Sequence, residues 1–227
     1  MSIWKRIGDA ISALANGEGL SAIFDHLRTP PERSVAFTIA VIALSAKMAK
    51  ADGLVTRDEV SAMREVFQIA REDEPGAARV FNLARKDVAG FEEYARRIRA
   101  MFGDGQDCLC DLMEGLFHIA MADGTYHPAE DAFLARVAEI FGMGEAEFRG
   151  LRSRFVPDAA PDPFAVLGVT PGTPIEDIRR AWKQLVRDTH PDAMVARGVP
   201  AEAVKMAEKR MIDLNNAWEE ISASEDA

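Results

Sequence analysis

Three residues with distinct chemistry follow one another where a helical pattern stops. His190, Pro191 and Asp192 lie within RDTHPDAMVARGVP. Proline removes a backbone donor and fixes its own φ, so the chain leaves the preceding helix in one direction and loses less entropy when a partner orders it. A carboxylate presented there can accept paired hydrogen bonds from an arginine, and a histidine at a helix C-terminus can donate to nearby carbonyls. Taken alone, the triplet more often marks an ordinary proline-stopped helix.

A basic strip precedes the triplet on a predicted helix that runs to about Thr189. Arg179, Lys183 and Arg187 recur at every fourth position, with Arg180 beside them. Such a strip attracts an acidic surface on a partner, although the same spacing is typical of a solvated helix face. The apolar residues of this helix form one separate stripe: Ile178, Ala181, Trp182, Leu185, Val186 and Thr189.

Two antiparallel helices are predicted to position the triplet. Thr173 and Pro174 supply an N-cap and a first-turn proline for the first helix. Apolar residues after the triplet recur at alternating steps of three and four, as in a coiled-coil seam: Val204, Ala207, Met211, Leu214, Trp218 and Ile221. We expect Trp182 and Trp218 to anchor the contact between the helices. The triplet then lies exposed in the connecting loop.

Residues 162–227 resemble a J-domain, because FAVLGV, IRRAWKQL, the His-Pro-Asp triplet and LNNAWEEI occur in the order of that family. The segment HPDAMVARGVPAEAVKMAEKR is similar to the longer loop of the DjlA-type co-chaperones, which carry a TerB-like domain upstream of a C-terminal J-domain. The resemblance implies docking on a DnaK-type heat-shock chaperone and acceleration of its ATP hydrolysis, so that it closes on a client polypeptide. It implies that His190, Pro191 and Asp192 form an activating loop. It also implies a partner-binding strip of four basic residues: Arg179, Arg180, Lys183 and Arg187.

Four positions depart from the J-domain pattern. Asp188 and Thr189 stand where that family usually has a basic and an aromatic residue, Ala193 replaces a common lysine, and Gln184 interrupts the strip. These departures predict weaker docking or a preference for one cognate partner. DjlA-type proteins usually begin with a transmembrane helix, and none is predicted here, so membrane residence is not carried over.

Two upstream stretches repeat each other: AKADGLVTRDEVSAMREVFQI and AMADGTYHPAEDAFLARVAEIF. In each copy a helix ends at Ala-Asp-Gly, where glycine can adopt the left-handed conformation, and a new helix begins at Thr56 or at His127-Pro128. Glu59 completes a capping box with Thr56, and Glu130 holds the same place in the second copy. The repeat predicts two helical hairpins packed about a pseudo-twofold axis.

These hairpins resemble the TerB-like (tellurite-resistance B) helical domain over residues 31–155. In that family the paired acidic positions matched by Asp52 and Asp123 have been suspected of binding metal. Capping explains both residues without a metal, and an EF-hand is disfavoured because glycine follows the aspartate at once. No metal is therefore assigned.

The remaining segments predict the domain organisation. Residues 1–30 are predicted to form an amphipathic helix, which ends near Gly17, followed by a connector. The apolar face of this helix either docks on the bundle or lies at a membrane surface. Residues 31–155 form the TerB-like domain, and a proline-rich linker at 156–161 leads to the J-domain at 162–227. Such a linker predicts that the two domains melt separately.

Composition bounds the function. Helical periodicity prevails and β-branched alternation is scarce, which predicts an all-α fold. The net charge of −10 argues against a general nucleic-acid binder. His26, His118 and His127 are scattered and neither cysteine has a motif partner, so we expect no enzyme and no cofactor.

The sequence therefore predicts a co-chaperone whose TerB-like domain is a targeting, client or sensing module. The alternative is a metal- or stress-sensing TerB module whose J-like tail is only an interaction arm. Expected partners are a DnaK-type chaperone and client polypeptides, with weak or no membrane contact; the oligomeric state stays open. We expect a cytoplasmic protein, with peripheral attachment to the inner membrane as the alternative.

Overall fold

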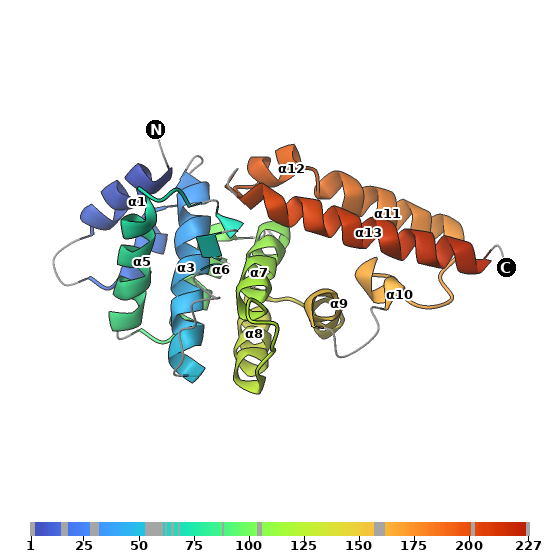
Figure 1. The fold of residues 1–227 in the computed structure, drawn as a ribbon, viewed down its shortest axis with the longest axis horizontal. Helices are drawn as coiled ribbons and strands as arrows, with labels where there is room; N and C mark the ends of the chain where they lie inside the picture. Colours follow the sequence, from blue (N-terminus) through green and yellow to red (C-terminus); the bar gives the residue numbers. More distant parts are fainter. Residues whose placement is uncertain are drawn as a thin grey trace.

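The computed structural model describes residues 3–14, 18–27, 32–52, 61, 63–64, 66–67, 69–87, 89–103, 106–156, 162–200 and 203–225. All regular secondary structure within these ranges is helical, which confirms the all-α prediction (Figure 1). The helices in chain order are α1 (Ile3–Ser12), α2 (Ile23–His26), α3 (Glu32–Asp52), α5 (Glu74–Lys86), α6 (Phe91–Phe102), α7 (Gln106–Ala120), α8 (Pro128–Phe141), α9 (Glu145–Phe155), α10 (Pro163–Val166), α11 (Ile175–Asp188), α12 (Pro191–Ala196) and α13 (Val204–Glu225), with a 3-10 turn at Leu20–Ala22.

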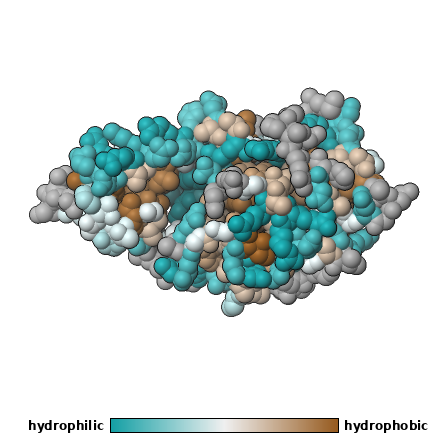
Figure 2. Space-filling model, turned by 180° about the vertical axis from the view of Figure 1, so that it is seen from behind, coloured by the Kyte–Doolittle hydropathy of each residue, from teal (hydrophilic) through white to brown (hydrophobic). Residues whose placement is uncertain are grey.

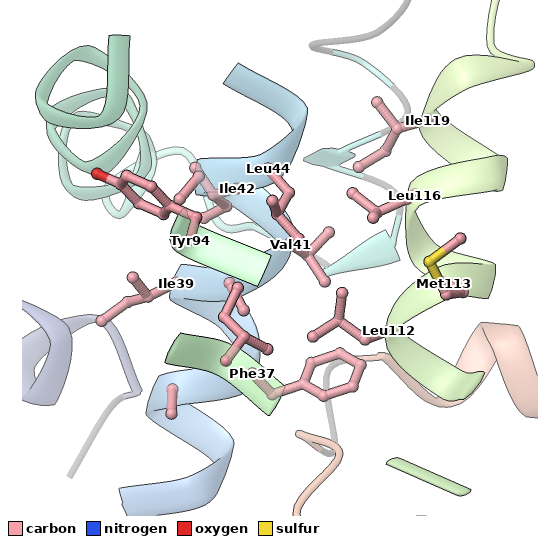
Figure 3. Packing of buried hydrophobic residues seen from close by; sticks show 14 of the residues in the cluster. Phe37, Ile39, Val41, Ile42, Leu44, Tyr94, Leu112, Met113, Leu116 and Ile119 are labelled. Atoms are coloured by element: carbon pink, nitrogen blue, oxygen red, sulfur yellow. The ribbon is translucent and has the colours of Figure 1, made fainter. Parts of the chain in front are cut away.

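Helix α3 is the centre of the bundle. It contacts α1, α5, α6, α7 and α8, so its residues 35–49 are all buried, and most of them are apolar. Figure 3 shows Phe37 and Val41 of α3 pointing toward Leu112 and Leu116 of α7, and all four are buried. The long apolar stretch of the sequence is therefore a core helix. Among the described residues, no helix is both long and apolar enough to cross a membrane.

Lys47 is a charged residue inside this core. Its Nζ donates to the carbonyls of Asp87 (2.9 Å) and Ala89 (2.6 Å) and lies 5.0 Å from the centre of the Tyr94 ring. Tyr94 Oη in turn donates to the Asp87 carboxylate at 2.6 Å. The buried ammonium is thus hydrogen-bonded, as burial of a charge requires.

The N-terminal helix α1 docks on the bundle. Four apolar residues form the face that is buried against α3 and α5: Ile3, Trp4, Ile7 and Ile11. Leu14 is partly buried beside this face. Of the two sequence-based alternatives for this face, the structure has the docked one.

The second repeat forms the predicted hairpin. Helix α7 ends at Ala120, Gly124 has a φ of 79°, and α8 begins at Pro128. The backbone N–H of His127 donates to Glu130 Oε2 at 2.9 Å, as the capping pattern predicts. In the first repeat α3 ends at Asp52. Thr56 and Glu59 lie outside the described residues, so their capping box stays a prediction.

The C-terminal hairpin of α11 and α13 forms around two stacked tryptophans. The rings of Trp182 and Trp218 are 5.2 Å apart with an interplanar angle of 12°, and Trp182 Nε1 donates to Asn215 Oδ1 at 3.2 Å. This confirms the predicted anchor. The predicted N-cap was wrong by one residue: Pro174 caps α11, because the Thr173 hydroxyl donates to the carbonyl of Thr170 at 2.8 Å.

Helix α13 belongs to two hydrophobic cores. Its outer part closes a small core with α10 and α11 that contains Leu167, Ile178, Leu214, Ala217 and Ile221. Its first turns enter the main core through Met206 and Ala207, as do Met194 of α12 and Val199 and Ala203 before α13. The hairpin and the bundle therefore share a packed interface. Because of this packing, we do not expect the two parts to melt fully independently of each other. The domain boundaries stay a prediction.

We predict that Trp4→Ala lowers the free energy of unfolding by about 3 to 5 kcal/mol, because it empties a buried aromatic site between α1 and the bundle. Chemical denaturation measures the change. Lys5→Ala is the matched control, since Lys5 is exposed on the same helix. Unchanged stability of Trp4→Ala together with weaker vesicle binding would instead place this face in a membrane surface.

Candidate functional site

The His-Pro-Asp triplet is exposed between two buried residues. Thr189 before it is 1% exposed and Met194 after it is 2% exposed. The side chains between them are open to solvent, at 62% for His190 and 95% for Asp192. The structure thus presents a short exposed segment whose two ends are fixed in the protein.

The segment after α11 is a helix, so the prediction of a loop was wrong. Helix α12 begins at Pro191, in the first position where its missing N–H costs nothing. His190 is its N-cap, and its Nδ1 accepts from the backbone N–H of Asp192 at 3.3 Å. His190 therefore accepts a hydrogen bond at a helix start, where the sequence predicted donation at a helix end. The Asp192 carboxylate is 95% exposed, and its Oδ2 lies 3.7 Å from His190 Nδ1.

The four residues of the basic strip lie exposed on α11: Arg179, Arg180, Lys183 and Arg187. Arg180 Nη1 pairs with Asp177 at 2.8 Å, and Arg187 Nη2 donates to Gln184 Oε1 at 2.7 Å. Gln184, which interrupts the strip in sequence, thus orients one of its members. Exposed pairs of this kind contribute little to stability and act mainly by steering a partner.

Large exposed apolar side chains are few in the described part of the chain, and one of them, Val195 of α12, lies three positions after Asp192. Figure 2 shows a face that is mostly hydrophilic, with small apolar areas. Among the described residues, the large apolar side chains that are exposed are Val195 and Ile212. Recognition at the hairpin is therefore expected to depend on charge and hydrogen bonding more than on apolar burial.

A buried charge network joins the bundle to the hairpin. We define it by Asp111 and Glu114 of α7, Arg154 of α9, Arg197 after α12 and Arg210 of α13. The carboxylates are buried, at 0% exposure for Asp111 and 3% for Glu114. Sequence analysis missed all five residues.

Arg210 pairs with both carboxylates, whereas Arg197 pairs with Asp111 and Arg154 with Glu114. Arg197 Nε and Nη2 donate to the two Asp111 oxygens at 2.7 and 3.1 Å, a bidentate pair. Arg210 Nη2 donates to Asp111 at 2.6 Å, and its Nε lies 2.9 Å from Glu114 Oε1. Arg154 Nη1 donates to Glu114 as well. Charges from α9, α12 and α13 thus meet on one helix.

The pairing favours the charged forms of Glu114, Arg197 and Arg210. Burial alone raises the pKa of the Glu114 carboxyl, but the guanidiniums of Arg154 and Arg210 lower it below the ordinary value. Burial lowers the pKa of Arg210, yet Glu114 and Asp111 raise it above the ordinary value. Asp111 likewise outweighs burial and raises the pKa of Arg197.

A sequence signal for this network does exist. In α7, Asp111 and Glu114 are three positions apart and flank the buried residues Leu112 and Met113. Acidic residues at the buried phase of a helix require buried partners. The partners could not be identified, because Arg197 and Arg210 lie 86 and 99 positions from Asp111.

The metal question concerns Asp52 and Asp123. Asp123 Oδ1 accepts from the N–H of Thr125 at 2.8 Å, which is a turn contact, and His127 Nε2 lies 3.8 Å from Asp123 Oδ2. The side chain of Asp52 is outside the described part. Within the residues that the structure describes, no three His, Cys, Asp or Glu side chains are grouped so as to hold a metal.

The two cysteines are not activated thiols. Burial raises the pKa of both Cys108 and Cys110. Cys110 also donates its thiol to Glu147 Oε1 at 3.1 Å, which keeps it protonated. Because the thiolate is the nucleophile, neither side chain is suited to covalent chemistry.

We predict that Glu114→Gln lowers the free energy of unfolding at pH 7 by about 3 to 5 kcal/mol, because it leaves buried arginines without a counter-charge. The pKa of Glu114 is lowered in the folded protein, so its contribution is present above the ordinary value of 4.5 and is lost as the pH falls through the folded value. The variant should therefore lose less stability on acidification than the wild type.

Denaturation at pH 7 and at pH values below 4.5 measures this difference. Glu219→Gln is the control, since Glu219 is exposed on α13. Equal acid sensitivity of the wild type and Glu114→Gln would show that the pairing of Glu114 with its arginines does not stabilise the fold.

Comparison with known proteins agrees with this architecture. Residues 38–153 match the family model of the tellurite resistance protein TerB. The chain is 27% identical to the co-chaperone protein DjlA of Photobacterium profundum (90% of this chain, 83% of that protein). It is 28% identical to that of Aliivibrio fischeri (83% and 78%) and 24% identical to that of Escherichia coli K12 (96% and 97%). No solved structure matches. The chain belongs to the TerB family and, by its similarity to DjlA proteins along most of its length, is a DjlA-type member of it.

Proposed function

We propose that this protein is a co-chaperone that docks on a DnaK-type chaperone through α11 and the His190–Asp192 triplet and stimulates its ATP hydrolysis. One observation carries the proposal: an exposed carboxylate, Asp192, stands at the end of a basic helix between two buried positions. Relatives that cover most of the chain are named co-chaperones. The same names support a binding protein without an active site of its own.

The proposed docking proceeds from charge to contact. The basic strip on α11 attracts an acidic surface of the chaperone and raises the association rate. Asp192 then accepts paired hydrogen bonds from a partner arginine, a geometry that favours one register. Because α12 and its cap already fix the backbone there, little entropy is lost on binding.

We assign the remaining parts of the chain accordingly. Residues 162–227 act as the chaperone-activating J-domain, and residues 31–155 act as a targeting, client or sensing module, joined by the linker at 156–161. The docked apolar face of α1 supports a cytoplasmic protein over one attached peripherally to the inner membrane. The alternative, a sensing module with a passive arm, is distinguished by Asp192, since a passive arm tolerates its loss.

We predict that Asp192→Asn abolishes stimulation of the chaperone ATPase and changes the free energy of unfolding by less than about 0.5 kcal/mol, because the side chain is exposed. Single-turnover ATP hydrolysis by a DnaK-type chaperone, with and without the protein, measures the effect. Glu208→Gln removes an equivalent exposed charge from α13 and should stimulate fully. Undiminished stimulation by Asp192→Asn would refute the proposal.

We predict that Arg180→Glu combined with Lys183→Glu slows association with the chaperone about tenfold at low salt, since exposed complementary charges act by steering. The wild-type association rate should fall as salt rises. Stopped-flow or surface-binding kinetics give both rates. Arg85→Glu with Lys86→Glu makes the same charge change on exposed residues of α5, so a general charge effect would slow both variants equally.

A further inference from the structure

Arg197 contacts two parts of the protein with one guanidinium. Its Nε and Nη2 hold the buried carboxylate of Asp111 in the bundle. Its Nη1 donates to the backbone carbonyl of Asp188 at 2.6 Å. Asp188 is the last residue of α11, two positions before His190. A single side chain therefore links the core of the TerB-like bundle to the backbone that leads into the triplet.

The carbonyl contact acts on the direction of the chain. The last carbonyls of a helix have no partner within the helix, and a cation there is favourable because of the helix dipole. A planar guanidinium can bond a carboxylate on one edge and a carbonyl on another, whereas an ammonium is a single point charge. The hydrogen bond from Arg197 to the Asp188 carbonyl thus sets how the last turn of α11 meets the bundle.

Arg197 itself is rigidly placed. It is the C-cap of α12, and the next residue, Gly198, has a φ of 106°. A Cβ on Gly198 would lie 2.8 Å from Cβ of Arg33, so the backbone is pressed closely against the start of α3. Val199 follows in the main core at 1% exposure. The anchor is therefore part of the bundle surface.

The other arginines of the buried charge network have a different task. Arg210 pairs with Asp111 and Glu114, and Arg154 pairs with Glu114 and lies 3.7 Å from Asp213 Oδ2. These contacts hold α13 and α9 against α7. Arg197 is the member whose hydrogen bonds also reach α11.

We infer that Arg197 is a positioning residue for the His190–Asp192 triplet, through which the TerB-like bundle fixes the presentation of Asp192. The inference rests on the proposed function for its effect on the chaperone. The bundle then contributes to activation without touching the partner, because it orders the end of α11 and the start of α12.

The test compares Arg197→Lys with the matched control Arg210→Lys. Both keep a positive charge beside Asp111, and the first removes the donor to the Asp188 carbonyl. We expect Arg197→Lys to lower the maximal stimulated ATPase rate about tenfold, as misplacement of a contact group does, with little change in the concentration for half-maximal stimulation. Arg210→Lys should keep the maximal rate once folded.

A second readout is independent of the chaperone. The N–H of Asp192 bonds to His190 Nδ1, and the N–H of Met194 bonds to the His190 carbonyl at 3.1 Å. We expect faster hydrogen exchange at both amides in Arg197→Lys and wild-type exchange in Arg210→Lys. If Arg197→Lys does not fold, Asp111→Asn loosens Arg197 from the bundle side and should show the same two effects.

Three results would decide against the inference or its basis. Wild-type exchange and maximal rate in a folded Arg197→Lys would overturn it. Equal losses in Arg197→Lys and Arg210→Lys would also overturn it, because the network would then act only as a clamp. A wild-type protein that does not stimulate the chaperone would refute the proposed function, while the exchange comparison would still decide whether Arg197 positions the triplet.

Discussion

The structure depends on two carboxylates that are almost completely buried. Asp111 and Glu114 lie on α7 inside the bundle, and burial of unpaired charge is costly enough to prevent folding unless cations come to them. The cations come from α9, from the chain after α12 and from α13. Segments far apart in sequence must therefore converge on one helix. This constraint joins the hairpin to the bundle.

The same constraint determines which face of the hairpin is left for a partner. Helix α13 turns Met206 and Arg210 toward the bundle and turns Leu214 and Trp218 toward α10 and α11. Because α13 lies between α11 and the bundle, α11 is on the side of α13 that faces away from the bundle. The hairpin extends away from the bundle (Figure 1). The basic strip consequently remains in solvent, where charge can act at a distance.

Local patterns predicted much of this molecule, and long-range pairing explains what they missed. The turn at Gly124, the cap between His127 and Glu130 and the stack of Trp182 on Trp218 involve short-range signals or regular apolar spacing, so the sequence predicted them. Helix α12 and the buried charge network were not predicted. In the network, Arg197 and Arg210 lie 86 and 99 positions from Asp111, a separation that periodicity does not register. Helix α12, in contrast, begins with a local signal, Pro191 after the N-cap His190. The proline-rich linker likewise predicted that the two domains melt separately, because the sequence did not reveal that the hairpin and the bundle share a core.

The departures from the J-domain pattern take on a physical meaning in this setting. Thr189 is 1% exposed beside the point where Arg197 reaches the Asp188 carbonyl, a place that suits a small side chain more than an aromatic one. The Asp188 carboxylate accepts from Gln184 Nε2 at 3.0 Å, and Gln184 in turn accepts from Arg187. Asp188 and Thr189 therefore lie where α11 meets the bundle, whereas Gln184 contacts Asp188 and Arg187 on the exposed side of α11. Contacts within this protein thus account for Thr189 and for the Asp188 backbone, while the weaker or more selective docking that the departures predict stays a prediction.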